Sequence, residues 1–258
     1  MRAVAVGARL LVLGLVFLVI VGPQLLALRF GWRLAERLPI LFHRLFLRLF
    51  SVRVVERGRP PEGLPTLVLA NHVSWLDIPV IGSRRPLSFI AKAEIGTWPV
   101  VGSFAKLQRS VFIDRGRRKA TAEVNHTVAR RLARGEAIVL FAEGTTGDGN
   151  RLLPFRSSLV GAARAALADP AIERIALQPL AIAYTRRNGL PVTRRERPEI
   201  AWYGDMELAP HLALFVRGGP LDAVVTWGEP IPFEATSDRK HATAAAEAAV
   251  RAAIRKGA

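Results

Sequence analysis

The chain has 258 residues, half of them hydrophobic, which is enough to bury a sizeable core as one domain. Its formal net charge of +16 favours a polyanionic partner, either nucleic acid or an anionic membrane surface. The sequence contains no cysteine, so disulfides, thiolate metal sites and thiol nucleophiles are excluded.

Residues 1–50 have the pattern of a membrane-associated helical region. The uncharged run from Leu10 to Leu28 would form a helix about 28 Å long, close to the thickness of a bilayer core. Pro23 and Gln24 weaken its far end, so a tilted or half-inserted helix fits the run as well as a full span does. A cleaved signal peptide is the alternative, but no small-x-small site follows the run, and we expect a retained anchor.

The segment from Phe30 to Phe50 has the pattern of a basic amphipathic helix. Leucines recur at helical spacing beside a stripe of arginines, and Pro39 is expected to kink or divide the helix. Such a helix is suited to a headgroup layer, with an ordinary core-facing helix as the alternative. Because the arginines after the apolar run outnumber Arg2 and Arg9 before it, we expect the following domain at the cytoplasmic face of the inner membrane.

Residues 51–65 are expected to form a turn-rich connector that leads to a globular domain over 66–258. In that domain, apolar runs alternate with helical patterns, and several runs end in polar residues. This alternation predicts a single α/β domain with a central mostly parallel or mixed sheet flanked by helices, and a site along one sheet edge. The expected strands are 67–70, 87–91, 111–113, 137–142, 175–184 and 221–227, and the expected helices are 118–134, 157–168 and 236–256.

A histidine and an aspartate follow the first strand of this domain. The apolar run ending at Ala70 leads into His72, and Asp77 comes after four intervening residues. A histidine whose ring is held by a carboxylate can act as general base on a hydroxyl. The spacing alone is a weak signal, since a lone histidine is more often structural and Asp77 also suits the cap of a helix entered through Pro79. The strand-end position favours the catalytic interpretation.

Three further strand ends supply candidate binding groups. Lys92 and Arg115 each end a strand, although in so basic a chain a single cation is more often a surface charge. Glu143, Gly144 and Thr145 form a better candidate, because glycine admits a ligand close to the backbone while the hydroxyl and free amides can hold an anion or polar head. An ordinary strand-to-loop turn is the alternative. We predict neither a metal site nor a cofactor.

Together these segments resemble the lysophospholipid acyltransferase family, which includes the bacterial 1-acylglycerol-3-phosphate acyltransferases. Four blocks occur in the family's order: Asn71 to Asp77 with the His-x4-Asp pattern, Val111 to Arg115, Phe141 to Thr145, and Leu177 to Leu180. Lys92 to Ile95 is similar to the lysine segment between the first two blocks. The resemblance covers about residues 66–227, and the amphipathic N-terminal region also suits the family.

The resemblance implies an O-acyltransferase that moves a fatty acyl group from a thioester of acyl carrier protein or coenzyme A to the hydroxyl of a lysolipid. His72 would take the proton from that hydroxyl, and Asp77 would fix the ring tautomer and stabilise the imidazolium, as in a serine hydrolase triad. Lys92, Arg115 and the Glu143-Gly144-Thr145 loop would position the acceptor head group.

The residue at position 146 bears on which of two lipid acceptors the resemblance favours. In family members with a phosphate-bearing acceptor, the residue after Glu-Gly-Thr is commonly arginine, which suits bidentate phosphate binding. Here it is Thr146, and the run from Glu143 to Arg151 is more similar to lyso-ornithine lipid acyltransferases, whose acceptor is a zwitterionic lipid without phosphate. Lyso-ornithine lipid is therefore slightly favoured over 1-acylglycerol-3-phosphate, and Asp148 is a candidate partner for a ligand ammonium.

Two other classes of function compete with this one. A non-catalytic basic protein that binds anionic lipid or nucleic acid would also explain the charge. However, Phe42, Phe46 and Phe50 project away from the arginine stripe, a poor layout for stacking bases, so we predict no nucleic-acid partner. A hydrolase that uses Ser74 is disfavoured because no Gly-x-Ser-x-Gly elbow surrounds this serine.

Overall fold

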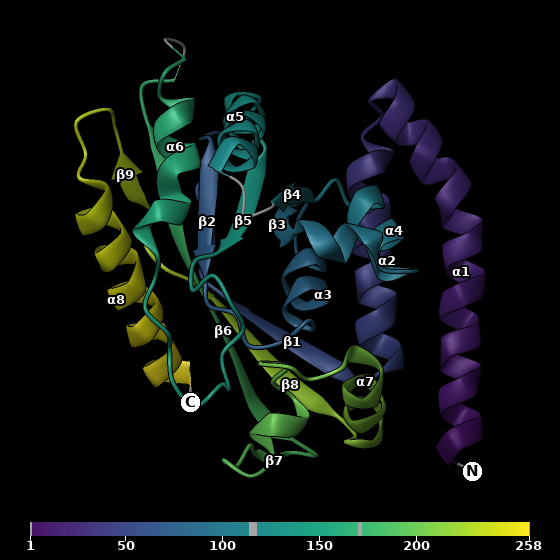
Figure 1. The fold of residues 1–258 in the computed structure, drawn as a ribbon. Helices are drawn as coiled ribbons and strands as arrows, with labels where there is room; N and C mark the ends of the chain where they lie inside the picture. Colours follow the sequence, from purple (N-terminus) through teal and green to yellow (C-terminus); the bar gives the residue numbers. More distant parts are fainter. Residues whose placement is uncertain (1, 114–117, 170–171, 258) are drawn as a thin grey trace.

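The computed structural model describes residues 2–113, 118–169 and 172–257, and a mixed sheet lies at its centre (Figure 1). Within these residues the strand order is β1-β8-β6-β2-β5-β3-β4, with β7 and β9 both paired to β6. The strands are β1 (Val52–Arg57), β2 (Thr66–Ala70), β3 (Ser88–Lys92), β4 (Val111–Ile113), β5 (Ala137–Phe141), β6 (Ile175–Arg187), β7 (Leu190–Pro191), β8 (Leu221–Trp227) and β9 (Ile231–Phe233). The predicted α/β class is confirmed.

Helices cover both faces of the sheet (Figure 1). The α-helices are α1 (Arg2–Phe30), α2 (Leu34–Leu49), α3 (Asp77–Gly82), α4 (Val101–Leu107), α5 (Arg118–Ala133), α6 (Gly161–Ala166), α7 (Leu208–Arg217) and α8 (Arg239–Gly257). Leu67 and Leu69 of β2 face a core shared with α5, α6 and α8. Val68 and Ala70 face the other core, which includes residues of α1, α2, α3 and α7. This two-sided burial follows from the alternation of side chains along a strand.

The register of the parallel strands determines where the polar strand ends meet. β2 lies between β5 and β6 and runs parallel to both, and β3 runs parallel to β5 and β4. The carboxyl ends of β2, β3, β4 and β5 therefore lie along one edge of the sheet. Crevices at this edge are the usual ligand sites of open α/β sheets.

Helix α1 is docked along the domain and does not stand apart from it. Its Phe17 ring lies 4.3 Å from Phe104 and 6.3 Å from Phe42, measured between ring centroids. Gln24 donates from Nε2 to the carbonyls of Ala35 at 3.0 Å and Leu107 at 2.8 Å. α1 is apolar and long enough to cross a membrane by length and composition, and its outward side chains are exposed: Leu11, Leu15, Leu18, Val19, Leu25 and Leu26.

Two expected boundaries differ from the structure. Residues 51–65, expected as a connector, contain β1, which pairs in parallel with β8 at the edge of the sheet, so the sheet begins before residue 66. Its partner lies far along the chain, and a short strand of mixed polarity gives little local signal. α2 also continues through Pro39 as one helix, so the proline does not divide it. The expected C-terminal helix is present from Arg239, and Asp238 caps it by accepting from the amides of Lys240 and His241.

Candidate active site

His72 and Asp77 are in contact at the carboxyl end of β2. His72 Nδ1 lies 2.8 Å from Asp77 Oδ2. Because a carboxylate only accepts hydrogen bonds, this contact assigns the ring proton to Nδ1 and leaves the lone pair on Nε2. The His72 side chain is 18% exposed, whereas that of Asp77 is fully buried, so the imidazole is the member of the pair that a substrate can reach.

Asp77 is held by more than the histidine. Its Oδ2 also accepts from the backbone amides of Val73 at 2.7 Å and Ser74 at 3.0 Å. Its Oδ1 accepts from the Tyr184 hydroxyl at 2.7 Å. Burial, together with the charge of Asp77, raises the pKa of Tyr184 well above its ordinary value, so the hydroxyl stays protonated and remains a donor.

The sequence did not reveal Tyr184, because it lies in the buried strand β6, 107 residues from Asp77. The presence of a tyrosine in this strand was the one available signal, since a buried tyrosine usually finds a hydrogen-bond partner. The partner itself followed only from the pairing of β6 with β2.

The ring and backbone of His72 are fixed by its neighbours. The imidazole stacks on Phe141, with ring centroids 3.8 Å apart and an interplanar angle of 11°. The carbonyl of His72 accepts from the amide of Gly147 at 2.8 Å. Asn71, one residue earlier, exchanges two hydrogen bonds with the backbone of Ile182 in β6. This turn is therefore preorganised by contacts on several sides, as a catalytic group requires.

Glu143 connects two loops at this edge. Its Oε1 accepts from the amide of His72 at 2.7 Å, and its Oε2 accepts from the amide of Leu153 at 2.9 Å. Burial raises the pKa of Glu143 to about 7, against the opposing effect of these two hydrogen bonds. Gly144 has a φ of +78°, a conformation that favours glycine, and Thr145 is exposed. Within the Glu-Gly-Thr loop, the glutamate thus contacts the protein and the threonine faces solvent.

Of the two cationic residues predicted to bind the acceptor, Lys92 and Arg115, the structure describes only Lys92. Lys92 ends β3, is 57% exposed, and forms an ion pair with Glu94 at 3.3 Å. Arg115 lies outside the described residues. The structure therefore brings together His72, Asp77 and Glu143 in direct contact, with Gly144 and Thr145 next in the chain, and leaves Lys92 on the surface at the end of the neighbouring strand.

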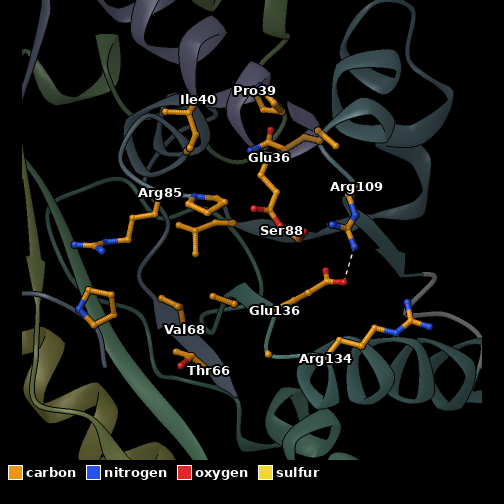
Figure 2. Close-up of a pocket in the computed structure, with 18 of the residues that line it drawn as sticks. Glu36, Pro39, Ile40, Thr66, Val68, Arg85, Ser88, Arg109, Arg134 and Glu136 are labelled. Carbon is orange, nitrogen blue, oxygen red and sulfur yellow. Dashed lines mark hydrogen bonds and ion pairs between the residues drawn. The ribbon is translucent and has the colours of Figure 1, made fainter. Parts of the chain in front are cut away.

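A cavity of about 370 Å³ lies at the opposite edge of the sheet (Figure 2). Thr66 and Ala137, the first residues of β2 and β5, line it, so it opens where these strands begin. An ion pair between Arg109 and Glu136, 2.5 Å long, crosses its wall (Figure 2). The lining does not include His72, and this cavity is therefore separate from the histidine site.

Comparisons with known proteins identify the class. Residues 51–183 match the family model described as Acyltransferase. The chain belongs to this acyltransferase family, and it is accordingly an enzyme of the acyltransferase class. It is 48% identical over 229 residues to lyso-ornithine lipid O-acyltransferase of Brucella abortus (strain 2308), covering 89% of this chain and 85% of the relative. It is 41% identical over 230 residues to the protein of the same name in Rhizobium meliloti (strain 1021), covering 89% and 79%.

Other relatives are named for the second candidate acceptor, 1-acylglycerol-3-phosphate. A 1-acyl-sn-glycerol-3-phosphate acyltransferase of Neisseria meningitidis is 44% identical over 107 residues, which are 41% of this chain and 42% of the relative. The crystal structure of the 1-acyl-sn-glycerophosphate (LPA) acyltransferase PlsC from Thermotoga maritima has a similar fold, with a TM-score of 0.61 at 22% identity over 99% of this chain and 97% of that one. The predicted family resemblance is confirmed.

Proposed function

We propose that this protein acylates the free hydroxyl of lyso-ornithine lipid with a fatty acyl group taken from a thioester of acyl carrier protein or coenzyme A. The contact between His72 Nδ1 and Asp77 Oδ2 carries the proposal, because it leaves a reachable basic nitrogen at the sheet edge. The choice of acceptor is supported by Thr146 after the Glu-Gly-Thr loop, and by two relatives of that name that match 89% of the chain.

The geometry supports one reaction sequence. His72 Nε2 removes the proton of the acceptor hydroxyl as its oxygen attacks the thioester carbonyl, and the carbon–sulfur bond then breaks. The imidazolium returns the proton to the leaving thiolate. Asp77 stabilises the imidazolium through Nδ1 and keeps the ring oriented. The nucleophile is the substrate hydroxyl, so no protein serine is required.

The head-group contacts inferred from the family pattern remain part of the proposal. Lys92, Arg115 and Thr145 would bind polar groups of the acceptor, since Lys92 ends β3 and the other two come shortly after β4 and β5 in the sequence. The position of Glu143 supports a different contribution, because both of its oxygens accept from backbone amides. It would hold the loops that carry His72 and Thr145 at a fixed separation.

The enzyme would act at an anionic membrane surface, on the cytoplasmic face of the inner membrane. The exposed apolar side of α1 supports membrane association. α1 also packs along α2 beside the domain (Figure 1), so a perpendicular span would draw the domain into the bilayer. A helix lying in one leaflet, with the α2 arginines near lipid phosphates, avoids that cost.

Replacement of His72 tests the assignment. Purified wild-type protein is offered lyso-ornithine lipid and lysophosphatidic acid side by side, each with an acyl thioester. We expect the first acceptor to react faster, and His72→Ala to lower turnover by about 100- to 10,000-fold because the general base is lost. His126→Ala, at an exposed histidine on α5, is the matched control and should retain activity. Substantial turnover by His72→Ala, with vesicle binding intact, would refute the base.

A further inference from the structure

Two tryptophans that are distant in sequence meet beside the His72 turn. The rings of Trp98 and Trp202 have centroids 6.2 Å apart and planes at 82°. Trp98 follows the short helix Ala93–Thr97 after β3, and Trp202 precedes α7. The backbone amide of Trp202 donates to the carbonyl of Val73 at 2.9 Å. The pair is thus attached to the residue that follows His72.

The rings have free surface and a fixed orientation. Trp202 Nε1 donates to the carbonyl of Met206 at 2.8 Å, which holds the indole in place. Both side chains belong to residues that are only partly buried. Among the described residues, three arginines lie over aromatic rings, and these rings belong to Phe30, Trp227 and Phe233 rather than to Trp98 or Trp202. The two tryptophans can therefore present ring surface to a cation from outside the chain.

A carboxylate lies on a loop that packs against the same turn. Gly147 donates to the carbonyl of His72, and a Cβ at Gly149 would lie 3.2 Å from a Val73 methyl and 3.9 Å from the Ala201 Cβ. Asp148 is between these glycines. Burial opposes its ionisation, but hydrogen bonds from Asn150 and from the Arg151 amide, together with the charge of Arg151, outweigh this and lower the pKa of Asp148. In the part of the chain that the structure describes, Asp148 makes no ion pair within 4.0 Å.

We propose that Trp98, Trp202 and Asp148 form a subsite for the cationic group of the acceptor head. An ammonium held against an indole face is attracted by the ring quadrupole, and a nearby carboxylate balances its charge. This inference rests on the proposed function and deepens it, because ornithine carries a side-chain amine that is protonated at neutral pH, as in lysine.

The residue at position 146 fits this subsite. Thr146 is uncharged and precedes Gly147 and Asp148. An arginine there, which suits a phosphate acceptor, would place a permanent positive charge close to Asp148 and would repel an ammonium. A neutral residue adds no second cation beside Arg151, and the Asp148 carboxylate, which accepts hydrogen bonds from Asn150, keeps its negative charge for the substrate. Selectivity for a cationic acceptor would thus come from the absence of an arginine at position 146 as well as from the aromatic surface of Trp98 and Trp202.

Blocking the charge of the substrate tests the subsite. The acceptors are lyso-ornithine lipid and the same lipid acetylated on its side-chain amine, which keeps the hydroxyl and chain but removes the charge. We expect wild-type kcat/KM to be about 5- to 30-fold higher for the unmodified lipid. Trp98→Leu and Asp148→Asn should shrink this ratio towards one, and Trp98→Phe should retain part of it. Asp205→Asn, at an exposed aspartate near Trp202, is the matched control and should preserve the ratio.

The outcomes separate the two proposals. If the wild-type protein acylates neither lipid, the proposed function is wrong. If it acylates both equally well, or if Trp98→Phe and Asp148→Asn lower both rates in parallel, the acyltransferase assignment stands and the ammonium subsite is wrong. Trp98→Phe and Asp148→Asn are conservative in size, so the comparison does not depend on Trp98→Leu folding normally.

Discussion

At the scale of single residues, the proposed catalytic pair of His72 and Asp77 depends on how the hydrogen bonds of a buried carboxylate are satisfied. Asp77 accepts a hydrogen bond from His72, two from backbone amides and one from Tyr184. Full burial of a carboxylate is tolerated when its oxygens are paired in this way. Because these donors approach from β6 and from the turn itself, the carboxylate has little freedom to rotate away from the imidazole.

Tyr184→Phe removes one of these donors while keeping the ring. We expect the free energy of unfolding to fall by about 1.5–3 kcal/mol, since a hydrogen bond to a charged group is lost in the interior. We also expect kcat to fall more than KM rises, because Asp77 is less well positioned while the acceptor contacts are untouched. Urea unfolding in detergent and steady-state kinetics measure the two effects. Tyr203→Phe, at the other tyrosine, controls for stability, and an unchanged kcat in Tyr184→Phe would contradict the positioning role.

Glu143→Gln tests the consequence of the raised pKa. The usual value of 4.5 increases to about 7 in the folded protein, so folding favours the protonated carboxyl. The stabilising contribution is therefore complete below about pH 4.5 and is lost as the pH rises through about 7. Relative to Glu143→Gln, the unfolding free energy of the wild type should fall by up to about 3 kcal/mol across that window.

Urea unfolding midpoints measured at a series of pH values give this difference directly. Glu229→Gln, at an exposed glutamate, should follow the wild type and is the matched control. A difference between the wild type and Glu143→Gln that does not vary with pH would show that Glu143 does not titrate in this range.

At the scale of elements, α1 has two faces with different surroundings. Phe17 and Gln24 contact α2, α4 and their ends, whereas Leu18 and its outward neighbours are exposed. A row of exposed apolar side chains along one helix marks an interaction site. Because the basic amphipathic helix α2 follows α1 directly, a lipid surface is the favoured partner.

Leu18→Glu places a charge on the outward face of α1, where the leucine is 68% exposed. We expect binding to anionic vesicles to weaken about tenfold or more, because apolar contact with lipid is lost and a like charge is added. Leu190→Glu changes an equally exposed leucine, at 71%, on β7 away from α1, and should bind like the wild type (Figure 1). Vesicle co-sedimentation measures both. Equal binding by the two variants would rule out α1 as the membrane contact.

At the scale of the whole molecule, the direction of the strands puts the His72 turn and the cavity of about 370 Å³ at opposite edges of the sheet. His72 and Glu143 follow the carboxyl ends of β2 and β5, whereas the cavity in Figure 2 opens at their first residues. The proposed acceptor site therefore lies at the edge where loops from several strands converge, away from this cavity.

The sequence by itself determined the class of fold, the closeness of His72 to Asp77 and the long apolar helix near the N-terminus. Each of these is encoded within a short window, as a hydrophobic period or a fixed spacing, and needs no knowledge of distant partners. The same holds for the strands β2 and β5, whose apolar runs are continuous.

Only the tertiary structure decided which distant groups meet these local features. Tyr184 reaches Asp77 across the pairing of β6 with β2, Trp98 meets Trp202 across the sheet edge, and β1 becomes a strand by pairing with β8. Contacts of this kind leave no period in the sequence, because the chain between the partners can have any pattern. The two backbone amides that donate to Glu143 are a further example, because the loops that carry them meet only in the folded protein.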